Sequence, residues 1–117
     1  MFGLQVNKGY AEIKSEIKQA LKEHFDDRIG SFSVFGQTDT PYSMFSMQFK
    51  MYDYFFVILN YDRGAFGCAI VNGELGIGLP NSQEWYDEAD MITFCKELQK
   101  QLELRIPDKF LEYKGWK

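Results

Sequence analysis

The strongest constraint on the fold is a run of strand-like segments between residues 31 and 79, joined by tight turns. The clearest turn is Asn72-Gly73, because this pair accepts the positive φ angles of a type I′ hairpin. Residues 42–51 alternate between large apolar and polar side chains, which predicts a strand with one buried face. Residues 54–61 are apolar without alternation and predict a central strand that is covered on both faces.

Amphipathic segments flank this run on both sides. Residues 8–25 carry apolar side chains at three- and four-residue steps, which predicts a helix with Asn7 as its N-cap. A second helix is predicted after the strands, with Asn81 and Glu84 as its capping pair. The aromatic side chains of the tail, residues 110–116, are expected to dock on the rest of the protein.

Consecutive strands joined by short loops usually pair with one another as antiparallel neighbours. The sequence therefore predicts an α+β fold, in which a five-stranded antiparallel meander sheet carries two flanking amphipathic helices on one face. A length of 117 residues fits one domain, and no repeat or linker divides it, so a single domain over residues 1–117 is expected.

Composition limits the classes of partner. The formal net charge of −4 disfavours direct binding to nucleic acid, because phosphate recognition requires a basic surface. The same charge suits a protein that meets a basic partner. Aromatic residues make up 17% of the chain, which serves a small core and also leaves Tyr and Trp for a recognition surface.

Two cysteines, Cys68 and Cys95, have neither a metal-ligand spacing nor a CxxC motif. We expect buried free thiols in a reducing compartment. The first residues lack the charged and apolar regions of a signal peptide, and no stretch is long and apolar enough to cross a bilayer. These features predict a cytoplasmic protein without membrane association.

No strong catalytic motif is present. His24 is the only histidine, which excludes a multi-histidine metal site and a histidine-based triad, and it is expected at the core edge or helix end. The glycine-rich residues 73–78 lack the Lys-Ser/Thr of a phosphate loop and are interpreted as hairpin and strand. We therefore expect no enzymatic activity, no metal ion and no cofactor.

The acidic segment after the strands is the best candidate for binding. Its carboxylates can stabilise the first turn of a helix through the helix dipole, or can hold a metal or a proton. A large ring among charges is also typical of an anchor at a protein interface. The candidate partner-binding residues are Glu84, Trp85, Asp87, Glu88 and Asp90.

The stretch from Leu104 to Trp116, LRIPDKFLEYKGW, follows an amphipathic helix and an Asn-Gly hairpin. With its small size, acidity and helix–sheet–helix order, the chain resembles the small cytoplasmic immunity proteins of bacterial toxin–immunity systems, including those of contact-dependent growth inhibition. This resemblance implies a protein that binds a cognate toxin domain, often a nuclease, and occludes its active site or substrate groove. It carries no functional residue over to this chain.

An alternative from another class is a regulatory domain that binds a small molecule or a peptide. Such a domain would use a pocket between the sheet and the helices. The competing interpretation is that the same residues form a packed core. The side chains that would line this pocket are Phe45, Met47, Phe49 and Phe56.

Overall fold

The computed structural model describes residues 9–117, so the predicted N-cap Asn7 lies outside the described residues. The helices are α1 (Tyr10–Phe25), α2 (Met91–Glu103) and α3 (Asp108–Lys114), with short 3-10 turns η1 (Asp26–Arg28) and η2 (Tyr86–Glu88). The strands are β1 (Ile29–Thr38), β2 (Met44–Met51), β3 (Phe55–Asp62), β4 (Ala65–Asn72) and β5 (Leu75–Gly78). None of the described helices is long and apolar enough to span a bilayer.

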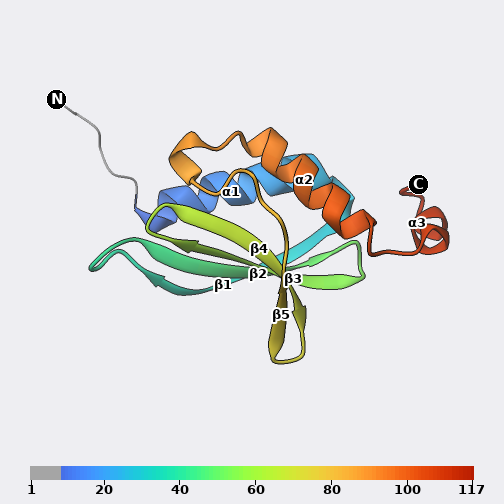
Figure 1. The fold of residues 1–117 in the computed structure, drawn as a ribbon, viewed down its shortest axis with the longest axis horizontal. Helices are drawn as coiled ribbons and strands as arrows, with labels where there is room; N and C mark the ends of the chain where they lie inside the picture. The colour runs from blue at the N-terminus through green and yellow to red at the C-terminus, as the bar shows by residue number, and fades with distance from the viewer. Residues whose placement is uncertain (1–8) are drawn as a thin grey trace.

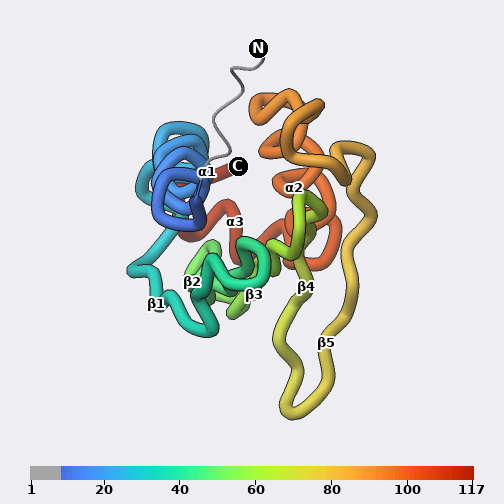
Figure 2. Tube along the Cα trace, turned by 90° about the vertical axis from the view of Figure 1, so that its left-hand side faces the viewer, coloured from blue at the N-terminus to red at the C-terminus, as the bar shows by residue number. Residues whose placement is uncertain are grey.

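The five strands form one sheet in the order β1-β2-β3-β4-β5, and every neighbouring pair is antiparallel. The predicted α+β meander is therefore confirmed, with α3 as an additional short helix. Both long helices lie on the same face of the sheet, while the β4–β5 hairpin projects away from them (Figures 1 and 2). Within residues 9–117, no element covers the opposite face of the sheet.

The core lies between the helices and one face of the sheet. Alternate residues of β2, β3 and β4 point into it, as the two-residue period of a strand requires. One apolar stripe of α1 and one of α2 cover them. Both cysteines are buried there as free thiols, as predicted. The buried side chains of the two helices are Ile13, Ile17, Leu21, Phe25, Phe94, Cys95, Leu98 and Leu102.

The prediction that β3 is covered on both faces is wrong. Val57, Leu59 and Tyr61 are buried against the helices, whereas Phe56 is 48% exposed on the other face. The strand lacks alternation because it carries apolar side chains on both faces, not because both faces are covered. Ile58, which is half-buried, also points to the uncovered side.

The predicted start of the second helix is also wrong. Residues 79–90 form a loop with one 3-10 turn, and α2 begins only at Met91. Asp90 is the N-cap, since its Oδ1 accepts a hydrogen bond from the backbone N–H of Ile92 at 3.0 Å. Asn81 and Glu84 therefore cap no helix, and Glu84 does not lie in a helical first turn.

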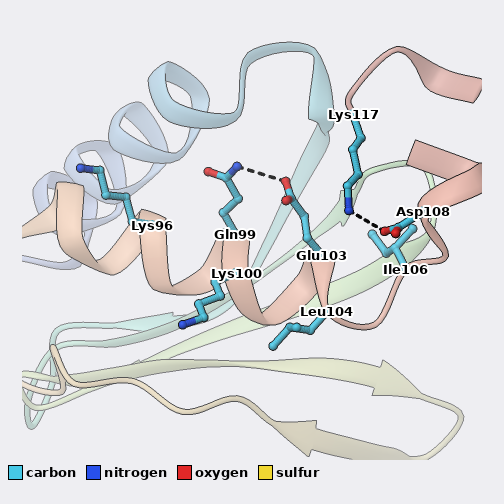
Figure 3. A pocket seen from close by; sticks show the side chains of 8 residues that line it. All are labelled: Lys96, Gln99, Lys100, Glu103, Leu104, Ile106, Asp108 and Lys117. Carbon is cyan, nitrogen blue, oxygen red and sulfur yellow. Dashed lines mark hydrogen bonds and ion pairs between the residues drawn. The ribbon is translucent and has the colours of Figure 1, made fainter. Parts of the chain in front are cut away.

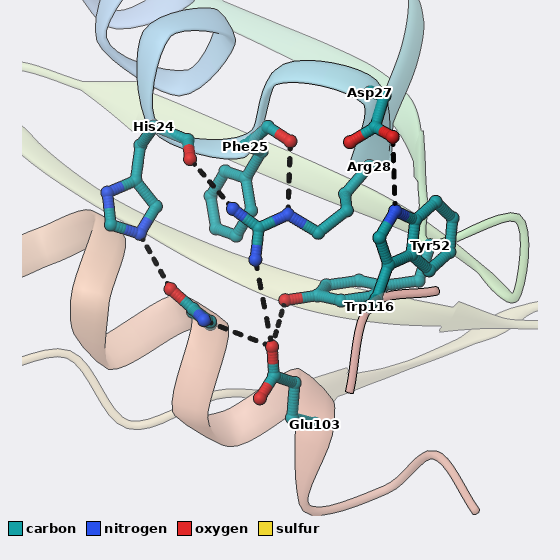
Figure 4. Close-up of polar contacts among 8 residues, drawn as sticks. His24, Phe25, Asp27, Arg28, Tyr52, Glu103 and Trp116 are labelled. Carbon is teal, nitrogen blue, oxygen red and sulfur yellow. Dashed lines mark hydrogen bonds and ion pairs between the residues drawn. The ribbon is translucent and has the colours of Figure 1, made fainter. Parts of the chain in front are cut away.

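A polar cluster ties the elements together at the end of the sheet where β2 turns into β3 (Figure 4). The buried Tyr52 hydroxyl donates to Glu103 of α2 at 2.7 Å, and Gln99 donates to the same oxygen at 3.0 Å. Arg28 lies 3.9 Å from this carboxylate and also donates to two carbonyl oxygens at the end of α1. His24 bonds Gln99 at 2.8 Å, so the only histidine is a helix-end residue, as expected.

The C-terminal tail docks at the same end. The Trp116 ring meets Tyr52 edge-on at a centroid distance of 5.6 Å, and its indole N–H donates to Asp27. Phe110 packs on Tyr54 at 5.0 Å, with the segment wound into α3. The predicted docking of the tail aromatics holds for these two rings, while the Tyr113 ring is exposed.

We predict that Tyr52→Phe lowers the free energy of unfolding at neutral pH by about 1–3 kcal/mol, because Glu103 loses a donor. Burial, followed by the bond to Glu103, raises the pKa of Tyr52. A tyrosine in the unfolded chain loses its proton near pH 10, whereas Tyr52 in the folded protein still keeps its proton at that pH. The free energy of unfolding therefore falls as the pH rises above about 10. Urea unfolding between pH about 8 and 10.5 should show a shallower fall for Tyr52→Phe than for the wild type.

Tyr113→Phe, at an exposed position, is the matched control and should follow the wild type at each pH. Equal pH slopes for Tyr52→Phe and the wild type would contradict the assignment of this dependence to Tyr52.

Candidate partner-binding surface

The loop of residues 79–90, which holds all five candidate partner-binding residues, lies along the outer edge of β4. Backbone bonds fasten it: Leu79 N–H donates to Cys68 at 3.0 Å, and Phe66 N–H donates to Glu84 at 2.9 Å. Next to these, the N–H of Tyr86 donates to the carbonyl oxygen of Gly64 at 2.8 Å. The loop therefore continues the sheet beyond the short strand β5.

Side chains within the loop complete this attachment. Asn81 donates to the carbonyl oxygen of Phe66 at 2.8 Å and accepts from the backbone N–H of Gln83 at 2.8 Å. Gln83 in turn accepts from the backbone N–H of Asp90 at 2.8 Å. Ser82 bonds Glu97 of α2 through both its backbone N–H and its hydroxyl. These bonds position the loop although it contains no α-helix.

Tyr86 anchors the loop to the core. Its ring lies edge-on to Tyr61 and Phe66, at centroid distances of 6.1 Å and 5.7 Å, and its hydroxyl donates to Glu16 of α1. Burial, followed by the bond to Glu16, raises the pKa of Tyr86. The pKa of Tyr61 is also raised, first by burial and then by the carboxylate of Asp87. Tyr86 thus has a structural role, and its neighbour Trp85 points the other way.

Trp85 lies on the uncovered face of the sheet. It forms an antiparallel bridge with Ala65, and opposed residues in such a pair share a face. Ala65 pairs with Asp62, and Asp62 pairs with Met44, so these four residues form one row across the sheet. The Trp85 side chain is 50% exposed. The structure thus holds a large ring in a defined position with one side open to solvent.

The acidic residues divide into two groups. Asp90 is committed to the helix, because it accepts from the Thr93 hydroxyl and from the Ile92 N–H, both at 3.0 Å, and these bonds lower its pKa. The side chains of Glu84, Asp87 and Glu88 are exposed and, within residues 9–117, form no hydrogen bond or ion pair. Helix-dipole stabilisation therefore accounts for Asp90 alone.

The charge around Trp85 is one-sided. Between Arg63 and Lys96 the chain contains five carboxylates and no lysine, arginine or histidine. Arg63 itself pairs with Asp62 at 2.9 Å and stacks over the Tyr42 ring at 4.4 Å. The charges that remain unpaired on the loop beside Trp85 are therefore negative.

Several exposed apolar residues on the same face were not among the candidate partner-binding residues. Phe56 and Ile58 of β3 share this face with Trp85, because their register partners Lys50 and Gln48 also point away from the helices. Phe35 of β1, opposite Ser46, belongs to the same face. For Phe56 and Ile58 the sequence signal is the unbroken apolar run of β3, which predicted coverage on both faces, whereas this run does not include Phe35 of β1.

The pocket proposed for the regulatory alternative is not formed by its four residues. Phe45, Met47 and Phe49 are packed core side chains beneath the helices, while Phe56 points to the opposite face of the sheet. The cavity between the end of β5 and α2, beside Cys68, measures about 10 Å³. This volume is no larger than a single water molecule needs.

A wider groove of about 550 Å³ lies on the outer side of α2 and the turn into α3 (Figure 3). Its polar groups largely satisfy one another: Lys117 pairs with Asp108 at 2.6 Å, and Gln99 bonds Glu103. Lys96 and Lys100 point in different directions along the helix (Figure 3). The groove contains none of the candidate partner-binding residues, and its charges do not converge on one point.

Across the described residues, no group of three or more His, Cys, Asp or Glu side chains is placed to hold a metal ion. Comparison with family models, curated proteins and solved structures gives no match.

We predict that Asp90→Ala lowers the melting temperature by a few degrees, because the first turn of α2 loses its cap. The folded-state pKa of Asp90 lies below its ordinary value, so its contribution is present near neutral pH and is lost as the pH falls through the acidic range. Thermal unfolding should therefore separate variant and wild type at pH about 7 and much less at pH about 3. Glu88→Ala, two residues earlier, should show little change at either pH.

Proposed function

We propose that this chain is an immunity protein that binds a cognate bacterial toxin domain, with a nuclease as the expected class, and neutralises it by occluding its active site. The observation that carries the proposal is Trp85, a half-exposed ring held rigidly in a segment whose only charges are carboxylates. The resemblance to immunity proteins in size, acidity and element order supports the same function. A cytoplasmic location, where such a toxin acts, belongs to this proposal.

The surface suits a partner with a basic groove. A nuclease binds phosphates through lysine and arginine, so its active-site groove is an electropositive target. Carboxylates such as Glu84, Asp87 and Glu88 accelerate association with such a groove by electrostatic steering. A buried aromatic anchor then slows dissociation, because much of the binding energy of an interface is concentrated in a few such residues. Occlusion of this kind requires no catalytic residue on the immunity protein.

The loop needs no refolding in order to bind. Its backbone is already fastened to β4, and Asn81 and Gln83 hold its interior polar groups. A flexible loop loses conformational entropy when it becomes ordered on binding. Here the loop is already ordered in the folded protein, so binding does not carry this cost. The proposed binding is therefore that of a preorganised surface.

The proposal requires that the reading frame directly upstream of the gene for this chain encodes a protein whose C-terminal domain inhibits growth, and this domain is the partner used in the test. We expect that co-expression with this chain restores growth to cells that the domain inhibits, and that calorimetry detects a one-to-one complex. Glu84→Lys/Asp87→Lys should lower the association rate at low salt by at least about tenfold. The loss should shrink as the ionic strength rises.

The matched control is Glu23→Lys/Glu112→Lys, which changes the net charge equally at exposed positions on α1 and α3. It should retain most of the wild-type association rate, and circular dichroism should be unchanged for both variants. The proposal fails if the upstream domain neither binds nor is neutralised. Equal losses for the two double variants would instead indicate a net-charge effect and would remove the loop from the interface.

A further inference from the structure

We infer that the toxin domain sits on the uncovered face of the sheet, with the acidic loop as the rim of this surface rather than its centre. This inference rests on the proposed function and names the surface that performs it. We call the side chains on this face the open face. Its principal members are Phe35, Lys50, Phe56, Ile58, Asp62 and Trp85.

The strand register puts these side chains on one surface. Phe35 of β1 is opposite Ser46, and Ser46 is opposite Asn60, so β1 to β3 present one row. Phe35 and Phe56 are 44% and 48% exposed, a high value for phenylalanines within a sheet. By register the two rings lie on different rows, with the pair Gln48–Ile58 on the row between them, so they are separate anchors on a surface that also carries polar side chains.

The open face is also smooth toward β5. Ala69 pairs with Gly78 and Val71 pairs with Gly76, so only small or branched side chains stand on this part. The absence of large side chains here allows another protein to approach the backbone closely, at a spacing of about 10 Å between packed layers. The β4–β5 hairpin projects to the side away from the helices and therefore flanks any partner on this face (Figure 1).

The size of the face agrees with a complete interface. Strands β1 to β4 have eight to ten residues each, and at a spacing of about 4.8 Å they span roughly 19 by 26 Å, or about 500 Å². A stable, specific interface buries about 600–1,000 Å² on each partner. The loop alone would supply a fraction of that area, whereas the open face with Trp85 and the loop as its rim reaches the required range.

Charge defines the chemistry and the orientation of the occupant. At the Trp85 end, the unpaired carboxylates of Glu84 and Asp87 attract a basic rim, since Arg63 already pairs with Asp62 there. At the opposite end, Lys50 of β2 puts a cation on the open face. A partner with an apolar or neutral centre and lysine or arginine on one side complements this arrangement. A toxin domain that exposes the rim of a phosphate-binding groove has that composition, so it is the occupant to which we commit.

The experiment measures the affinity of the same upstream toxin domain for open-face variants of the full chain. Phe35→Ser/Phe56→Ser removes two exposed rings, and we expect at least about a tenfold loss of affinity. Ile92→Ser/Leu104→Ser is the matched control, because it removes two side chains that are 64% and 70% exposed on the helical side. The control should bind within about twofold of the wild type.

A second variant keeps the experiment interpretable if the double phenylalanine variant misfolds. Asn60→Arg puts a long cation at an exposed position in the middle of the open face and leaves the core untouched. This variant should also lower the affinity for the basic toxin domain by about tenfold or more. Its melting temperature should stay within a few degrees of the wild-type value.

The outcomes separate the two proposals. Wild-type affinity for both open-face variants, combined with tight binding by the wild type, would overturn the inference and leave the immunity function in place. Absence of toxin binding by the wild type would overturn both. If light scattering finds a dimer of this chain that Asn60→Arg dissociates, the occupant is a second copy and our commitment to the toxin domain is wrong.

Discussion

Burial of a single face of the sheet against α1 and α2 is the interaction on which the rest of the structure depends. The buried side chains of β2 to β4 meet apolar stripes of two helices, and among the described residues only Tyr52, Ile106 and Leu111 of the buried core lie outside this layer. Because the helices occupy only one side, the two ends of the sheet and its last strand require other support. Glu103 joins α1, the β2–β3 turn and α2 at one end, and Tyr86 joins the loop to the core at the other.

The loop of residues 79–90 connects stability to function in this arrangement. It protects the outer edge of β4, which would otherwise expose unpaired backbone groups to other chains. The same attachment sends Tyr86 into the core and Trp85 to the opposite side, because successive residues of an extended segment point to opposite faces. The contacts that cover the edge of β4 therefore also hold the Trp85 ring in a fixed, exposed position. Asp90 ends the same segment and caps α2.

Sequence reasoning succeeded where one local pattern determines the outcome. The alternation of β2 and the Asn-Gly pair correctly indicated the meander, since strand register follows from neighbouring residues. The type I′ turn predicted at Asn72-Gly73 is wrong, because Asn72 still pairs with Leu75 and, of the turn residues Gly73 and Glu74, only Gly73 has a positive φ. Sequence reasoning also failed at the start of α2, where Asn81 and Glu84 match a capping pair but Asn81 bonds the backbone of Phe66 instead. That choice depends on a strand fifteen residues away, which a local pattern cannot contain. The five candidates lie together in the loop, but their division into an exposed anchor, free carboxylates and one cap depends on the bridge between Ala65 and Trp85 and on the position of α2.

The error over β3 is the most informative one. β3 carries apolar side chains on both faces, but the helices cover only one of them. Its second apolar face therefore remains exposed to solvent. The Lys50 ammonium lies 5.5 Å from the centre of the Phe56 ring and covers it only in part, because the side chain remains 48% exposed. It keeps this part of the surface hydrated and charged. Such cover suits a protein that exists alone before it meets its partner, since a lysine side chain is flexible and can be displaced without disturbing the sheet. The same strand therefore explains both the mistaken expectation of a second covering layer and the proposal that a toxin domain provides that layer on binding.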